Sequence, residues 1–122
     1  MAYILVVDDE PMLRRTLRAI LEKAGHTVAE AEDGKQALKI FSANKPDLVL
    51  TDIIMPDREG VETIGELRQL DAQVPIIAMS GGGSTGGDLF LTLAIHMGAT
   101  RTLAKPIRQT DLLEAIAACL SD

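Results

Sequence analysis

The sequence predicts an α/β fold in which a single parallel sheet is covered by helices on both faces. Five short apolar segments alternate with five segments whose apolar residues recur at helical spacing. The length of 122 residues and the 47% hydrophobic content suit one domain with one core region. Right-handed crossovers between parallel strands place the helices on both faces. We therefore expect residues 1–122 to form a single domain.

The five predicted strands differ in how continuously apolar they are. They cover residues 3–7, 27–31, 47–51, 74–79 and 101–104. The first, third and fourth are apolar almost throughout, which is typical of strands covered on both faces. Glu30 and Arg101 interrupt the second and fifth, which we expect at the edges. This pattern favours a flavodoxin-like (βα)5 doubly wound sheet of strand order 2-1-3-4-5, with its ligand crevice beyond the carboxyl ends of the strands.

Start and stop signals delimit the predicted helices. The first runs from Pro11 to a stop at Gly25, and Leu17 and Leu21 lie on its inner face. The second begins near Asp33 and ends before Pro46, because the residue before a proline avoids helical backbone angles. The third is expected from about Glu59, with Gly60, Ile64 and Leu67 on one face, and the last two are expected over about 88–97 and 109–120.

Composition excludes several classes of function. The chain has 18 acidic and 12 basic residues, a net charge of −6, and 2% aromatic residues, which argues against direct nucleic-acid binding. Cys119 is the only cysteine, so an internal disulfide and a multi-cysteine metal site are excluded. No apolar stretch approaches the roughly 20 residues that span a bilayer, and the run from Tyr3 breaks at Asp8, too early for a signal peptide. We expect a cytoplasmic protein with no membrane contact.

Chemically active side chains follow four of the predicted strands. Asp8 and Asp9 follow the first strand, Asp52 the third, Ser80 the fourth and Lys105 the fifth. Carboxyl ends of parallel strands meet at one edge of the sheet, so these groups should lie together. Three crowded carboxylates stay ionised only beside a cation, and their hard oxygens suit Mg²⁺.

The same constellation suits phosphoryl transfer, in which positioning and charge neutralisation supply most of the catalysis. Asp52 is the central carboxylate and the natural nucleophile, and its product would be an acyl phosphate. Lys105 would supply a positive charge, and Ser80 a hydroxyl donor, on the other side of the pocket.

Further motifs stand at characteristic spacings around these residues. They are Val6-Val7-Asp8-Asp9-Glu10, Asp33-Gly34, Asp52-Ile53-Ile54-Met55-Pro56 through Gly60, Pro75-Ile76-Ile77-Ala78-Met79-Ser80, and Gly98-Ala99 leading to Lys105-Pro106. Each is weak alone, but all of them in this order are specific. Over essentially its whole length the chain resembles the receiver domain of two-component response regulators, including the chemotaxis-response-regulator-like members.

The resemblance implies a role for each site residue. Asp52 would accept a phosphoryl group from a phosphohistidine on a sensor histidine kinase or a phosphotransfer protein, and Ser80 and Lys105 would hold the phosphoryl oxygens. The implied Mg²⁺ ligands are Asp9 directly, Asp8 mainly through water, Asp52 by a carboxylate oxygen and Ile54 by its backbone carbonyl. A cis Lys105-Pro106 bond is also implied. The protein would be a signalling switch that catalyses only its own phosphorylation and dephosphorylation.

Two positions depart from the family pattern. Thr102 stands three residues before Lys105, where the family often has a Tyr or Phe that moves inward on phosphorylation, so that aromatic readout is missing. Residues 81–87 are rich in glycine and formally contain G-x-G-x-x-G. This segment follows the fourth strand and has no acidic ribose partner about 20 residues later, so we reject a dinucleotide site. We interpret it as a hinge that orders when Ser80 engages phosphate.

The fourth helix is expected to carry the output surface. At 100° per residue, Phe90, Leu93, Ala94 and Met97 share the inward face, and Leu91 and Ile95 point outward. The resemblance implies that a downstream protein binds the face formed by helix 4, strand 5 and helix 5. Leu91 and Ile95 could also support a homodimer, and scattered surface aliphatics are the plain alternative.

Other residues receive plainer interpretations. Arg14, Arg15 and Arg18 form a basic cluster on the first helix, which is either a solvated face or a kinase contact. His26 and His96 are read as surface or boundary residues, and Cys119 as a small packing residue.

Two other functions remain open at this point. A haloacid-dehalogenase-like phosphatase also uses an aspartyl phosphate, but its nucleophile follows the first strand. A degenerate interaction module would keep the fold without phosphorylation. The chain is either a stand-alone regulator or a portion of a longer protein.

Overall fold

The computed structural model describes residues 2–53, 59–81 and 87–121, with the backbone alone at 59–61, 81 and 87–91. Strands and helices alternate in the order β1 (Tyr3–Val7), α1 (Pro11–Lys23), β2 (Thr27–Ala31), α2 (Gly34–Ala43), β3 (Leu48–Asp52), α3 (Glu59–Leu70), β4 (Ile76–Gly81), α4 (Gly87–Met97), β5 (Arg101–Lys105) and α5 (Gln109–Leu120). All the strand pairs are parallel, in the order β2-β1-β3-β4-β5. The predicted flavodoxin-like fold and both edge strands are confirmed.

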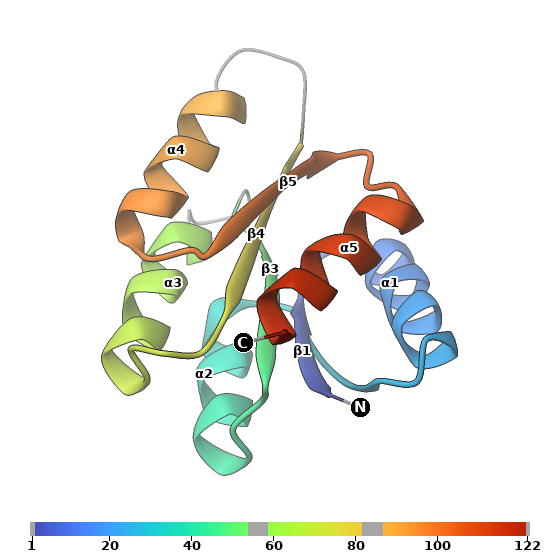
Figure 1. Ribbon diagram of the computed structural model, residues 1–122. Helices are drawn as coiled ribbons and strands as arrows, with labels where there is room; N and C mark the ends of the chain where they lie inside the picture. The colour runs from blue at the N-terminus through green and yellow to red at the C-terminus, as the bar shows by residue number, and fades with distance from the viewer. Residues whose placement is uncertain (1, 54–58, 82–86, 122) are drawn as a thin grey trace.

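Helices cover both faces of the sheet, as Figure 1 shows, with α1 and α5 on one face and α2, α3 and α4 on the other. Two apolar clusters fill these two layers. Leu17, Leu21 and Ile116 pack on the α1/α5 side, and Phe41 and Ile64 pack on the opposite side. Alternate strand residues feed the two clusters, because successive side chains of a strand point to opposite faces.

Helix boundaries follow the predicted local signals. Pro11 is the first residue of α1, and Gly25 beyond its end has a φ of 99°. The Asp33 side chain caps α2 by accepting a hydrogen bond from the Gln36 N–H at 2.8 Å. None of the helices in the described ranges is long and apolar enough to cross a membrane.

Three strands differ from their predicted bounds: β3 begins and ends one residue later, β4 begins and ends two residues later, and β5 is one residue longer. Pro75 has no N–H to give to the sheet, so β4 begins at Ile76 and continues to Gly81. β3 extends to Asp52, and β5 to Lys105. Asp52, Ser80 and Lys105 are consequently part of the strands, which hold their backbones in register.

The described side chains of helix α4, at residues 92–97, are less buried than their apolar sequence suggests. Ala94 is fully buried, and Met97, although 39% exposed, directs its Cε toward Gly65 of α3. Leu93 is 43% exposed, so its predicted inward orientation is wrong. The buried face is centred on Ala94, and Leu93 and Met97 lie on its flank at helical spacing. Ile95 is 48% exposed, as predicted. The side chains of Phe90 and Leu91, and the proposed hinge at 82–86, lie outside the described residues.

Candidate functional site

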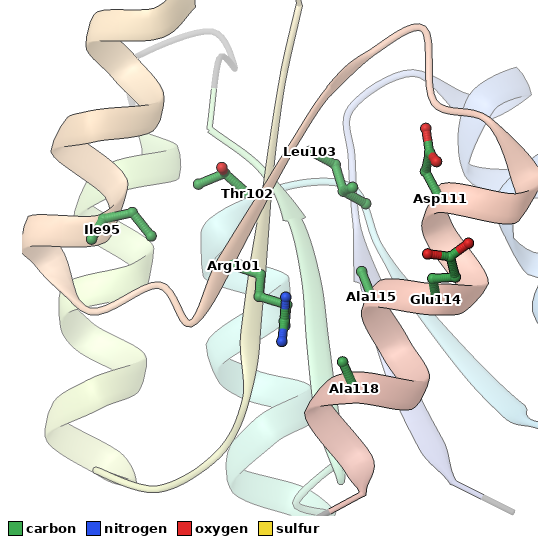
Figure 2. Close-up of a pocket in the computed structure, with 8 residues that line it drawn as sticks. All are labelled: Ile95, Arg101, Thr102, Leu103, Asp111, Glu114, Ala115 and Ala118. Carbon is green, nitrogen blue, oxygen red and sulfur yellow. The ribbon is translucent and has the colours of Figure 1, made fainter.

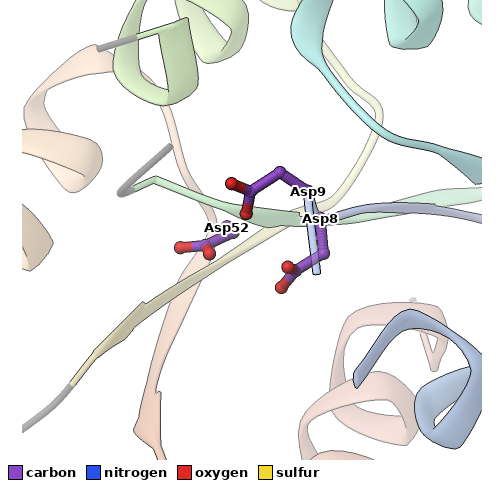
Figure 3. A group of neighbouring side chains, drawn as sticks. All are labelled: Asp8, Asp9 and Asp52. Carbon is purple, nitrogen blue, oxygen red and sulfur yellow. The ribbon is translucent and has the colours of Figure 1, made fainter. Parts of the chain in front are cut away.

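Three carboxylates meet at the carboxyl edge of the sheet. Asp8 follows β1 directly, Asp9 comes next in the chain, and Asp52 is the last residue of β3 (Figure 3). Each offers one carboxylate oxygen, and these oxygens lie within 4.8 Å of one another. Asp8 and Asp52 are 0% and 3% exposed, whereas Asp9 faces solvent. The structure thus brings together the predicted acidic residues.

Lys105 lies against two of these carboxylates. Its Nζ is 2.8 Å from Oδ2 of Asp52 and 3.2 Å from Oδ2 of Asp8. Burial is the largest single influence on the Lys105 pKa and lowers it, but hydrogen bonding and charge attraction from Asp52 and Asp8 together outweigh burial and raise the pKa. Lys105 therefore carries a positive charge. Three carboxylates and one ammonium leave two net negative charges when all are ionised.

Asp8 is held by its backbone as well as by its side chain. Its N–H donates to the carbonyl oxygen of Ala31 at 3.1 Å, which continues the β1–β2 pairing. Its Oδ1 accepts a hydrogen bond from the Glu10 N–H at 2.9 Å, and its Oδ2 accepts from Lys105. Its carbonyl oxygen accepts from Nη1 of Arg14 at 2.8 Å. Both Asp8 carboxylate oxygens are engaged within the chain, which suits the implied contact with a metal through water.

Strand register places Ser80 between the strands that carry Asp52 and Lys105. Asp52 is paired with Met79, Ser80 with Ala104, and Gly81 with Lys105. Ser80 is fully buried. Its strand thus lies directly between the two strands that end in the predicted phosphoacceptor and the predicted lysine.

The remaining site predictions have mixed outcomes. The Lys105-Pro106 peptide bond is cis, as the resemblance implies. Ile54, the predicted carbonyl ligand, lies outside the described residues. Thr102 is half-buried on β5 and lines the groove described below.

The basic cluster of α1 is largely engaged within the chain. Nε of Arg14 and Nη1 of Arg18 each lie 2.8 Å from a different carboxylate oxygen of Glu30 on β2. Hydrogen bonding from Arg18 is the main cause that lowers the pKa of Glu30, and Arg14 adds to it against partial burial. Arg15 is exposed. The solvated-face interpretation is therefore wrong for Arg14, which is half-buried.

Sequence reasoning missed the contact between Arg14 and Asp8. Arg14 lies in the first turns of α1, close in sequence to the acidic residues, and that proximity was the available signal. Its acceptor is a backbone carbonyl, which leaves no signature in the identity of any residue.

The donor set fits a hard divalent cation. Carboxylate oxygens from three residues lie within reach of one ion, and Mg²⁺ takes such oxygens while keeping several of its waters. Asp9, exposed and adjacent to the buried pair, gives the cluster an open side. A cation here would offset the two excess negative charges.

A separate groove of about 560 Å³ lies between α4, β5 and α5 (Figure 2). It is lined by Ile95, Arg101, Thr102, Leu103, Asp111, Glu114, Ala115 and Ala118. In the picture Ile95 projects from α4 on one side, and the acidic side chains project from α5 on the other. Its residues come from the three elements predicted to form the output face.

Known proteins match this chain over most of its length. Residues 4–117 match the family model described as "Response regulator receiver domain". The chain is 40% identical over 114 residues to the chemotaxis protein CheY of Bacillus subtilis, covering 93% of this chain and 92% of that protein. It is 38% identical to the transcriptional regulatory protein CpxR of Klebsiella pneumoniae, covering 96% of this chain but 48% of CpxR.

Solved structures show the same fold. A receiver domain protein from Clostridium thermocellum superposes with a TM-score of 0.89 at 32% identity, covering 99% of this chain and 95% of that one. A CheY-like receiver domain protein from Methanospirillum hungatei gives a TM-score of 0.88 at 30% identity, covering 99% and 94%.

Proposed function

Because the chain belongs to the response regulator receiver family, we propose that it accepts a phosphoryl group on Asp52 in a Mg²⁺-dependent reaction and thereby switches its protein contacts. The donor would be a phosphohistidine on a sensor histidine kinase or a phosphotransfer protein. The observation that carries the proposal is the contact of the Lys105 ammonium, 2.8 Å from Oδ2 of Asp52, inside a cluster of three carboxylates. As part of this proposal, residues 1–122 act as one receiver domain in the cytoplasm.

In the transfer step, a carboxylate oxygen of Asp52 attacks phosphorus as the nitrogen–phosphorus bond of the phosphohistidine breaks. The imidazole nitrogen leaves with the bond's electron pair and takes up a proton, and an acyl phosphate remains on Asp52. Lys105 and the Ser80 hydroxyl would donate hydrogen bonds to the phosphoryl oxygens. When bound by Asp9 and Asp52 directly, Asp8 through water and the Ile54 carbonyl, Mg²⁺ would neutralise phosphoryl charge.

The chain would later lose this phosphoryl group to water at the same site. The oxygen of a water molecule bonds to phosphorus, the bond from phosphorus to the Asp52 oxygen breaks, and inorganic phosphate leaves as Asp52 returns to a carboxylate. The chain is thus changed and restored by the reaction, and it turns over no separate substrate. This behaviour distinguishes a signalling receiver from a phosphatase.

Phosphorylation would be read out through β4 and β5. A phosphoryl group that draws Ser80 toward Asp52 moves the end of β4, which pairs with β5 along the edge of the output groove. Leu103 and Ala115 give the groove an apolar floor, and the exposed Asp111 and Glu114 outnumber Arg101. This charge balance favours a partner segment that combines an apolar anchor with basic residues.

The groove proposal is tested with the Glu114→Lys variant. We expect it to lose binding of the downstream protein while it is phosphorylated as fast as wild type. Exposed Glu62 on α3, far in sequence from the groove, supplies the matched control Glu62→Lys. If the phosphorylated chain dimerises and Glu114→Lys abolishes the dimer, the occupant of the groove is instead a second copy of the chain. Leu91 and Ile95 would then contribute to the dimer contact.

Intact-mass measurement after incubation with acetyl phosphate and Mg²⁺ tests the phosphorylation itself. The wild-type chain should gain the mass of one phosphoryl group, and Asp52→Asn should gain none. Omission of Mg²⁺ should also prevent labelling. An unlabelled wild-type chain would favour the degenerate interaction module, and sustained turnover of a phosphomonoester would favour the phosphatase.

A further inference from the structure

We propose that Arg14 is a positioning residue that holds the Asp8-Asp9 segment in the geometry needed to bind a divalent cation. Nη1 of Arg14 donates to the carbonyl oxygen of Asp8 at 2.8 Å, and Nε of the same guanidinium donates to Oε1 of Glu30 at 2.8 Å. The Arg14 side chain is only 15% exposed. One side chain of α1 thus joins the acidic segment to edge strand β2.

The acceptor explains why this contact matters for the site. The Asp8 carbonyl belongs to the peptide bond that leads into Asp9, the exposed carboxylate of the cluster. Fixing this carbonyl limits rotation of the Asp8-Asp9 peptide plane and so restricts where the Asp9 side chain can lie. The N–H of Asp8 is already fixed by Ala31, so Arg14 completes the restraint from the opposite side.

Guanidinium geometry suits this bridge. Arginine presents several donors in a rigid plane, so it can hold a carbonyl and a carboxylate at once. Lysine keeps the charge but has a single ammonium and cannot reproduce both contacts in the same geometry. Glu30 orients the guanidinium, because it accepts from Arg14 on one oxygen and from Arg18 on the other.

Arg18 provides a matched control within the same ion-pair group. Within the described part of the chain, its side chain binds Glu30 and Glu22 and makes no hydrogen bond or ion pair with Asp8. Loss of either arginine removes one positive charge and one ion pair with Glu30. Only the loss of Arg14 releases the Asp8 carbonyl.

The direction of the effect separates positioning from charge. Arg14 is a cation beside an acidic cluster, so its charge alone disfavours a second cation, and its removal would tighten Mg²⁺ binding. A purely structural role would lower stability and leave affinity unchanged. If Arg14 positions the Asp8-Asp9 segment, its removal should weaken Mg²⁺ binding.

The test is calorimetric titration of the unphosphorylated chain with Mg²⁺, combined with thermal unfolding in a chelator. We expect Arg14→Gln to weaken Mg²⁺ affinity by about three- to tenfold, which corresponds to about 0.65–1.4 kcal/mol and matches the loss of one hydrogen bond. Arg14→Lys should stay weakened, Glu30→Gln should lose less, and Arg18→Gln should bind within about twofold of wild type.

The inference rests on the proposed function only through its metal site, and the outcomes are distinguishable. A wild-type chain that does not bind Mg²⁺ overturns both the metal site and the role of Arg14. Wild-type affinity in Arg14→Gln, or full restoration by Arg14→Lys, overturns the role of Arg14 alone. An equal loss in Arg18→Gln also overturns it. Glu30→Gln carries the test if Arg14→Gln does not fold, and unchanged affinity there counts against the inference.

Discussion

Replacement of Lys105 by methionine is expected to destabilise the metal-free chain and to increase its stabilisation by Mg²⁺. The substitution keeps an unbranched apolar stem and removes the ammonium that lies 2.8 Å from Asp52 and 3.2 Å from Asp8. Two nearly inaccessible carboxylates would then adjoin Asp9 with no cation among them. The net charge of the group changes from −2 to −3 when all are ionised.

The magnitude follows from burial. Removing one partner from a fully buried ion pair costs about 3–5 kcal/mol. The Lys105 side chain retains 19% exposure and Asp9 faces water, so solvent screens part of the interaction. We expect the free energy of unfolding in a chelator to fall by about 2–3 kcal/mol. The solvent-exposed Lys39 on α2 supplies the control Lys39→Met, which should stay within about 0.5 kcal/mol of wild type.

The assay is urea unfolding followed by circular dichroism, with chelator and at increasing Mg²⁺. A ligand that binds only the native state stabilises it by about 2.7 kcal/mol at one hundred times its dissociation constant. Lys105→Met should gain more than wild type at each Mg²⁺ concentration, because the ion replaces the missing positive charge. Unchanged stability in chelator, or an equal Mg²⁺ increment in both chains, would refute this electrostatic account of the site.

Three further predictions concern the site and its support. Asp9→Asn should lose most of the Mg²⁺-induced increase in unfolding free energy, because it removes a metal ligand. Its stability in chelator should not fall below wild type, because it also removes a repulsive charge. Urea unfolding with and without Mg²⁺ measures both quantities. Gly98→Ala should lower the unfolding free energy by about 1–3 kcal/mol, since Gly98 has a φ of 120° and an added Cβ would lie 2.7 Å from Cγ of Arg68. Gly65→Ala is the control in the same urea assay, because its added Cβ would meet only the flexible end of the Met97 side chain. We expect a smaller loss of unfolding free energy there, and equal losses in the two variants would contradict the role of backbone strain at Gly98. The two arginines lower the pKa of Glu30. The ionised Glu30 therefore stabilises the fold fully at pH values above the ordinary glutamate pKa of about 4.3. This stabilisation is lost as the pH falls through the lowered pKa of the folded state. Glu30→Gln should therefore make acid unfolding less steep between those two pKa values, as measured by circular dichroism against pH.

Local sequence signals were sufficient for most of the fold. The boundaries of β1 and β2 agree with the prediction, because Asp8 and Gly25 interrupt the apolar pattern sharply. The fourth strand was predicted too early, because Val74 and Pro75 continue the apolar run although proline cannot join the ladder. Periodicity predicted the position of α4 in the sequence correctly, but it did not predict how deeply the α4 side chains are buried. That burial depends on how closely the helix approaches the sheet at Ala94.

The candidate site was predictable where it depends on strand ends and unpredictable where it depends on backbone acceptors. Asp8, Asp52 and Lys105 could be grouped because parallel strands deliver their last residues to one edge. To predict the contact of Arg14 with the Asp8 carbonyl, one needs the angle at which α1 crosses β1, and the sequence does not give that angle. Helical periodicity assigns a residue to a side of the helix, but it does not identify the atom that the residue meets.

The two adjacent aspartates show how burial separates residues of identical chemistry. Asp8 is inaccessible to solvent, and its N–H, carbonyl and both carboxylate oxygens are engaged by other parts of the chain. Asp9 is exposed and is the carboxylate on the open side of the cluster. Lys105 on β5 contacts the Asp8 carboxylate and Arg14 on α1 contacts the Asp8 carbonyl, so we expect a shift of either element to affect the Asp8-Asp9 segment. We therefore expect a cation bound at this edge to be coupled to β5, the strand that also lines the groove between α4 and α5.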